Sequence, residues 1–67
     1  MQTFFLNGLK YRATHHLTIF DVLYYFDYSI SLLVIEYNSY ILPKNDWKNT
    51  IICNGDKIEI VTIVGGG

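Results

Sequence analysis

The residues of this sequence with the most distinctive chemistry are three consecutive glycines, Gly65, Gly66 and Gly67. Glycine loses more backbone freedom on ordering than any other residue, so a triple glycine adds nothing to a strand or a helix. A segment without Cβ atoms is thin and can thread a narrow channel into another protein. A frayed terminus is the trivial interpretation. The elements that precede the glycines favour a functional tail that presents the Gly67 carboxylate to partner enzymes.

The chemistry expected of this carboxylate depends on activation. A terminal carboxyl group has a pKa of about 3.3–3.7, so it is ionised at neutral pH and inert as an acyl donor. Attack of the carboxylate on the α-phosphate of ATP converts it to an acyl adenylate, which can then accept sulfide or a thiol. The reacting group is thus a main-chain carboxylate of Gly67, and no side chain takes part.

Few side chains are candidates for catalysis or metal binding. Cys53 is the single cysteine, which excludes an internal disulfide and a cysteine-rich metal site, and we expect it to be a small core residue. His15 and His16 are adjacent in a predicted loop, where we expect them to be solvated. The acidic residues have no spacing that pairs them for acid–base catalysis: Asp21, Asp27, Glu36, Asp46, Asp56 and Glu59. We therefore expect neither an enzyme nor a bound metal or other cofactor.

Size and charge limit the function classes further. The 67 residues suffice for one small domain, and a hydrophobic content of 51% allows that domain a dense core. The net charge of −1, without a basic cluster, argues against nucleic-acid binding. No apolar stretch reaches the length of a membrane span. We expect a cytoplasmic protein, or one of the plastid stroma if its gene is organellar, as the abundance of Ile, Asn and Lys suggests.

The first half of the chain predicts a hairpin and a helix. Asn7-Gly8 is typical of a two-residue hairpin turn and joins predicted strands at residues 2–6 and 9–13. Thr18, with Asp21 three residues later, predicts a capped helix start. The helix is expected to end near Asp27 or Tyr28, and its apolar stripe consists of Ile19, Val22, Leu23 and Phe26.

The second half of the chain predicts strands and turns. Trp47 is expected to fold back over the core from a helical turn at residues 44–47, directly after Pro43. The predicted strands cover residues 32–37, 40–42 and 57–64, with a brief extended piece at 50–53 and a turn at 54–56. The last strand is apolar and leads directly into the glycines.

This order of elements predicts an α+β fold. A single helix that lies across a mixed sheet buries its stripe and the inner face of the sheet together. With a hairpin first and a long strand last, the first and last strands lie side by side at the centre. We expect a ubiquitin-like β-grasp domain at residues 1–64, with a four- to five-stranded mixed sheet and one main helix, followed by a flexible tail at residues 65–67.

The last strand also predicts an interaction surface. If Ile58 and Ile60 face the core, then Glu59, Val61 and Ile63 lie on the outer face of the sheet. Exposed apolar residues there would form a docking patch for partner enzymes, composed of Val61, Ile63 and Val64. The alternative is a central strand that the domain covers on both faces.

Several segments, in this order, resemble the thiamin-biosynthesis sulfur carriers of the ThiS family. They are the Asn7-Gly8 hairpin, Ile41-Leu42-Pro43-Lys44 with Asp46-Trp47, Gly55-Asp56 with Ile58-Glu59-Ile60, and the ending Ile63-Val64-Gly65-Gly66-Gly67. The resemblance implies a partner similar to the ubiquitin-activating enzyme, which consumes ATP to adenylate Gly67. It further implies a sulfurtransferase or cysteine desulfurase as the sulfur source, and thiazole synthase as the acceptor. The final pair essential in the family corresponds to Gly66 and Gly67.

Three other functions use the same tail chemistry. The small subunit of molybdopterin synthase delivers sulfur to a different acceptor, although this chain is short for that family. A ubiquitin-like modifier joins its glycine carboxylate to lysines of target proteins, and a related carrier thiolates transfer RNA. A β-grasp module with a purely structural role is the remaining alternative.

Overall fold

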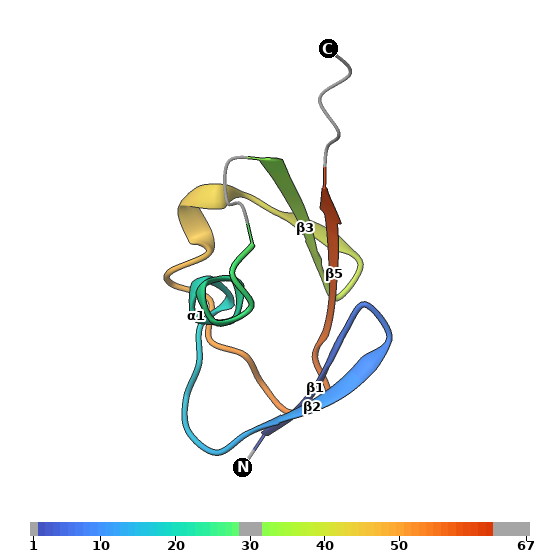
Figure 1. The fold of residues 1–67 in the computed structure, drawn as a ribbon, viewed down its shortest axis with the longest axis vertical. Coiled ribbons are helices and arrows are strands. Elements are labelled where there is room, and N and C mark those ends of the chain that lie inside the picture. The colour runs from blue at the N-terminus through green and yellow to red at the C-terminus, as the bar shows by residue number, and fades with distance from the viewer. Residues whose placement is uncertain (1, 29–31, 63–67) are drawn as a thin grey trace.

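One helix packs against one face of a five-stranded sheet (Figure 1). The computed structural model describes residues 2–28 and 32–62. The elements are β1 (Gln2–Leu6), β2 (Leu9–Ala13), α1 (Ile19–Tyr25), β3 (Leu33–Tyr37), β4 (Tyr40–Leu42), the 3-10 helix η2 (Lys44–Asp46) and β5 (Lys57–Thr62). The strand order is β2-β1-β5-β3-β4, in which β5 runs parallel to β1 and antiparallel to β3. The predicted mixed sheet, with the first and last strands adjacent, is confirmed.

The hairpin between β1 and β2 forms where the sequence predicts it. Asn7 and Gly8 both have positive φ, 50° and 84°, as a type I′ turn requires. The turn sets the register in which Phe4 faces Tyr11 and Leu6 faces Leu9. Phe4 and Leu6 are consequently both directed into the core.

The start of α1 is a capping box, as predicted. The backbone N–H of Asp21 donates to Thr18 Oγ1 at 3.1 Å, and the backbone N–H of Thr18 donates to Asp21 Oδ2 at 2.9 Å. Ile19, Val22 and Leu23 are buried beneath the helix. The fourth residue of the predicted stripe, Phe26, is the C-cap and is 37% exposed, because the helix ends before it.

The end of α1 lies at Tyr25, earlier than the predicted Asp27 or Tyr28. Asp27 adopts a left-handed backbone conformation, with φ of 59°. Its N–H donates to the carbonyl of Tyr24 at 3.1 Å, and the N–H of Tyr28 donates to the carbonyl of Leu23 at 3.0 Å. These two bonds form a Schellman motif, which usually has glycine at the position of Asp27. The sequence prediction lacked that glycine signal.

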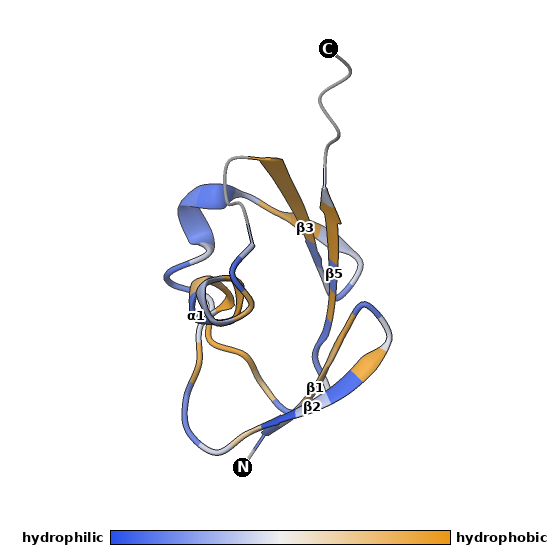
Figure 2. Cartoon of the chain, viewed as in Figure 1, coloured by the Kyte–Doolittle hydropathy of each residue, from blue (hydrophilic) through white to orange (hydrophobic). Residues whose placement is uncertain are grey.

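The core lies between α1 and the sheet, and the connection from β4 to β5 completes it. Trp47, predicted to fold back over the core, is 3% exposed, and its indole N–H donates to the carbonyl of Leu42 at 3.0 Å. Figure 2 shows apolar residues on α1, β3 and β5 around this layer and a hydrophilic η2 outside it. The buried apolar residues are Phe4, Leu6, Ala13, Ile19, Val22, Leu23, Leu33, Ile35, Trp47, Ile52 and Ile58.

The segment before β5 corrects the prediction made for Cys53. Ile52, not Cys53, enters the core, with 1% of its surface exposed. The N–H of Ile52 donates to the carbonyl of Leu17 at 2.8 Å, and Ile51 makes an isolated bridge with Thr18. This placement turns the side chain of Cys53 outward, and Cys53 is exposed. The predicted extended piece at residues 50–53 is reduced to that single bridge.

Candidate functional site

The described part of β5 ends at Thr62, just before the predicted tail. β5 pairs with β3 from Ile58 to Thr62, but with β1 only at Lys57 and Ile58. Beyond Ile58, the side-chain amide oxygen of Asn7 accepts the N–H of Ile60 at 2.7 Å. The far half of β5 therefore has a neighbouring strand on one side only within the described residues, and it extends away from the β1–β2 hairpin (Figure 1).

Most of the predicted site lies outside the described residues. Ile63 and Val64 of the docking patch fall there, as do the three glycines of the tail, Gly65, Gly66 and Gly67. Three parts of the sequence analysis therefore remain predictions: the flexible tail, the domain boundary between residues 64 and 65, and the role of the Gly67 carboxylate. Val61 is the member of the docking patch that the structure places.

Alternate residues of β5 face opposite sides of the sheet, as predicted. Ile58 is 1% exposed and Ile60 packs against the core, so both point toward α1. Glu59 and Val61 lie on the outer face, where both are exposed and Val61 retains 52% of its surface. The alternative of a strand covered on both faces does not hold at these two residues.

The strand register arranges the outer face in rows. Nearest the predicted tail, Val61 lies opposite Val34 of β3. The next row places Glu59 opposite Glu36, with Ile41 of β4 beside Glu36. A third row, across β5, β1 and β2, consists of Lys57, Phe5 and Lys10. We refer to these eight residues as the outer face.

The sequence did not reveal that two of its acidic residues lie opposite each other. Glu36 and Glu59 are separated by a turn, β4, η2 and the long connection to β5, so their spacing along the chain carries no signal. Strand register brings them together. The register follows from burying Ile35 and Ile58 on the same inner face, because a shift of one strand by one residue would turn its buried side chains to the outer face.

A buried carboxylate fixes the start of β5. Asp56 is 7% exposed and accepts hydrogen bonds from the hydroxyl of Tyr37, from Asn38 Nδ2 at 3.0 Å and from the N–H of Cys53 at 2.7 Å. Burial, together with the hydrogen bond to Asp56 and its negative charge, raises the pKa of the Tyr37 phenol well above its ordinary value of 10.0. This network attaches the turn before β5 to the end of β3 and so aligns β5 in the sheet.

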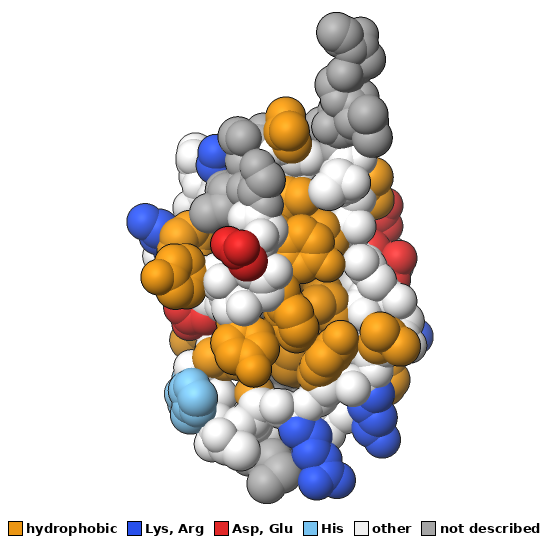
Figure 3. All heavy atoms as spheres, viewed as in Figure 1, with side chains coloured by type: hydrophobic (Ala, Val, Ile, Leu, Met, Phe, Trp, Pro, Cys, Tyr) orange, Lys and Arg blue, Asp and Glu red, His pale blue; other side chains and the backbone are white. Residues whose placement is uncertain are grey.

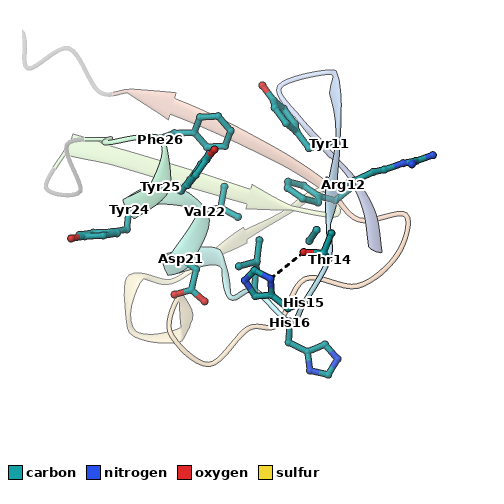
Figure 4. A pocket seen from close by; sticks show the side chains of 13 residues that line it. Tyr11, Arg12, Thr14, His15, His16, Asp21, Val22, Tyr24, Tyr25 and Phe26 are labelled. Atoms are coloured by element: carbon teal, nitrogen blue, oxygen red, sulfur yellow. Dashed lines mark hydrogen bonds between the residues drawn. The ribbon is translucent and has the colours of Figure 1, made fainter. Parts of the chain in front are cut away.

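A groove of about 820 Å³ lies between β2, the loop that follows it and α1 (Figure 4). Its walls are largely aromatic: the rings of Tyr11 and Phe26 meet edge to face at 5.3 Å, and those of Phe26 and Tyr25 at 5.1 Å. His15 and His16 are exposed at one end, as predicted, and the His16 side chain is directed away from the groove.

Two polar side chains at the end of the groove take part in local hydrogen bonds. His15 Nδ1 lies 3.3 Å from Thr14 Oγ1, and the carboxylate of Asp21 accepts the N–H of Thr18 in the capping box. Among the described residues, no group of three or more histidine, cysteine, aspartate or glutamate side chains is placed to hold a metal ion. Across residues 2–28 and 32–62, no helix has the length and apolar character needed to cross a membrane.

Comparison with known proteins relates nearly the whole chain to one family. The model of the ThiS family matches residues 5–67. An uncharacterized protein, ycf40, of Trieres chinensis is 54% identical over 66 residues, which cover 98% of this chain and 90% of that protein. The uncharacterized protein ycf40 of Porphyra purpurea is 39% identical over 62 residues, covering 92% and 87% of the two chains.

A solved structure has the same fold. The crystal structure of a thiamine biosynthesis protein (ThiS) from Geobacter metallireducens matches with a TM-score of 0.83, covering 98% of this chain and all of that one. At 20% sequence identity, this likeness establishes the ubiquitin-like β-grasp fold. Because the family model spans all but the first few residues, the chain belongs to the ThiS family.

Proposed function

We propose that this chain is the sulfur carrier of thiamin thiazole formation. The observation that carries the proposal is the extent of the family match, which covers residues 5–67 and so includes the triple glycine. The β-grasp fold supports it, since its central strand β5 leads toward the tail. The place of action is the cytoplasm, or the plastid stroma if the gene is organellar.

The proposed cycle begins with the Gly67 carboxylate. An oxygen of this group attacks the α-phosphorus of ATP in the active site of a ubiquitin-activating-like adenylyltransferase; an acyl–phosphate bond forms and pyrophosphate leaves. The terminal sulfur of a persulfide on a sulfurtransferase or cysteine desulfurase then attacks the acyl carbon, and AMP leaves. A thiol reductant cleaves the sulfur–sulfur bond of the resulting acyl disulfide, is itself oxidised to a disulfide, and frees the thiol of the sulfur donor. The product is a C-terminal thiocarboxylate, whose sulfur thiazole synthase incorporates into the thiazole ring.

In this cycle the chain is a co-substrate and not a catalyst. It binds no cofactor of its own, and the ATP is consumed by the activating partner. The glycine tail enters the active sites of the partner enzymes; it consists of Gly65, Gly66 and Gly67. The docking patch binds the enzyme surface next to the active site; it consists of Val61, Ile63 and Val64. The exposed side chain of Val61 supports this division of roles.

Intact mass spectrometry tests the proposal. The chain is incubated with ATP, a sulfur source and the adenylyltransferase of the source organism. We expect a mass gain equal to the replacement of one oxygen by sulfur, and no gain in a variant that lacks Gly67 but remains folded. Covalent adducts with other proteins would indicate a modifier instead. Sulfur loading that survives deletion of Gly67 would refute the proposal.

A single substitution tests the docking role of Val61. Val61→Asp places a charge in the patch and is expected to raise the KM of the adenylyltransferase for the carrier about tenfold, because apolar contact is lost. Ile51→Asp is the matched control, since Ile51 is 50% exposed but belongs to the connection before β5. A folded Val61→Asp variant with the KM of the wild-type chain would contradict the docking role.

A further inference from the structure

The outer face combines two features that conflict within the isolated chain. Glu36 and Glu59 lie directly opposite each other on adjacent antiparallel strands, where like charges are destabilising. Exposed apolar side chains border the pair, with Ile41 70% and Val61 52% exposed. Figure 3 shows acidic atoms at the right-hand edge of the molecule, next to apolar ones.

The described chain does not neutralise this pair of carboxylates. Neither Glu36 nor Glu59 makes an ion pair or a side-chain hydrogen bond with another described residue. The nearest basic row, Lys57 and Lys10, lies on the other side of the pair from Val61, nearer the start of β5. The outer face is thus graded along β5, from basic through acidic to apolar, toward the predicted tail.

Such a gradient fits a partner with the complementary order. A cation between the two carboxylates would remove their repulsion, and a guanidinium can donate to both at once. The apolar residues next to them exclude water on contact, which strengthens the charge interaction. The gradient also disfavours docking of the carrier in the reversed orientation, because basic residues of the partner would then face Lys57 and Lys10.

We propose that the outer face docks the adenylyltransferase through a basic side chain of the enzyme, an arginine by its geometry, that lies between Glu36 and Glu59 while apolar groups of the enzyme cover Val61, Val34 and Ile41. This rests on the proposed function, which supplies the enzyme as partner. The acidic pair then sets the direction in which the carrier docks on the enzyme.

Direct binding tests the proposal without any chemistry. The dissociation constant of the adenylyltransferase is measured in the absence of ATP for the wild-type chain, for Glu36→Gln/Glu59→Gln and for Glu36→Lys/Glu59→Lys. We expect a loss of affinity of about three- to tenfold for the glutamine variant and more than about tenfold for the lysine variant. The glutamine pair keeps the shape of the side chains, so it remains informative if the lysine pair fails to fold.

Asp46→Lys is the matched control. Asp46 is exposed and lies in η2, on the connection from β4 to β5 and not on the outer face, and its substitution changes the charge by the same amount per residue. It should leave affinity within about twofold of the wild-type value. Binding of the wild-type chain should weaken with added salt more steeply than binding of the glutamine variant.

The outcomes separate this inference from the function on which it rests. Unchanged affinity of the glutamine and lysine variants, or no binding of the wild-type chain, would overturn the docking inference. Pyrophosphate exchange is then measured on the same samples. Wild-type binding that is weakened in the two double variants but yields no exchange would contradict the proposed function and support the docking inference.

Discussion

At the scale of single residues, Asp56 is the buried polar side chain among the described residues. It is 7% exposed and accepts from Tyr37, Asn38 and the N–H of Cys53. Asp56→Ala leaves these donors unpaired in a partly buried site. We expect the free energy of unfolding to fall by about 3 kcal/mol, since hydrogen bonds to charged groups contribute about 1.5–3 kcal/mol each.

Urea unfolding measures this effect. Asp56→Asn keeps one oxygen acceptor at the same place, so its loss should be smaller than that of the alanine variant. Equal stability of Asp56→Ala and the wild-type chain would show that the network does not stabilise the start of β5.

The phenol of Tyr37 predicts a dependence of stability on alkaline pH. Its pKa is raised above 10.0 by burial first and then by the hydrogen bond and negative charge of Asp56, so the folded state favours the protonated form. The corresponding stabilisation is fully present below pH 10 and is lost as the pH rises through the folded-state pKa, because there the unfolded chain releases the proton more readily.

The measurement compares the wild-type chain with Tyr37→Phe in urea at several pH values from about 8 to 12. The wild-type chain should lose more stability than the variant over this range. The difference between the two profiles isolates Tyr37, because all other side chains are the same in both proteins. Parallel profiles would contradict the assigned role of Tyr37.

At the scale of elements, the N-terminus of α1 gives the clearest prediction. The Thr18 side chain accepts the N–H of Asp21 at 3.1 Å, so Thr18→Ala removes the cap and should destabilise the protein by about 1 kcal/mol. Thr14→Ala serves as the control, because Thr14 is exposed in the preceding loop and caps no helix. If both variants lost the same stability, the cap would have no specific effect.

Elements with a short-range signal were predictable from the sequence. The turn at Asn7-Gly8, the capping box of Thr18 and the fold-back of Trp47 each depend on residues a few positions apart. The end of α1 was not predictable, because Asp27 adopts a left-handed conformation that is more typical of glycine. Cys53 was misplaced because its neighbour Ile52 enters the core instead.

At the scale of the whole molecule, the adjacency of the first and last strands followed from the sequence, but the arrangement of charge on the sheet did not. A hairpin, one helix and an apolar last strand leave few ways to bury both apolar faces, so β1 and β5 lie together. The contact between Glu36 and Glu59 depends on the register of β3 against β5, which local patterns do not specify. The arrangement of charged and apolar side chains on the outer face was therefore identified only from the structure.

The central claim is that this chain delivers sulfur to thiazole synthase from the Gly67 carboxylate, and one transfer measurement tests it most directly. The carrier is loaded with heavy-isotope sulfur, purified as the thiocarboxylate and mixed with thiazole synthase and its other substrates. We predict that the label appears in the thiazole product while the carrier returns to the mass of the carboxylate form. Label that stays on the carrier with thiazole synthase, yet leaves it with the large subunit of molybdopterin synthase, would contradict the claim.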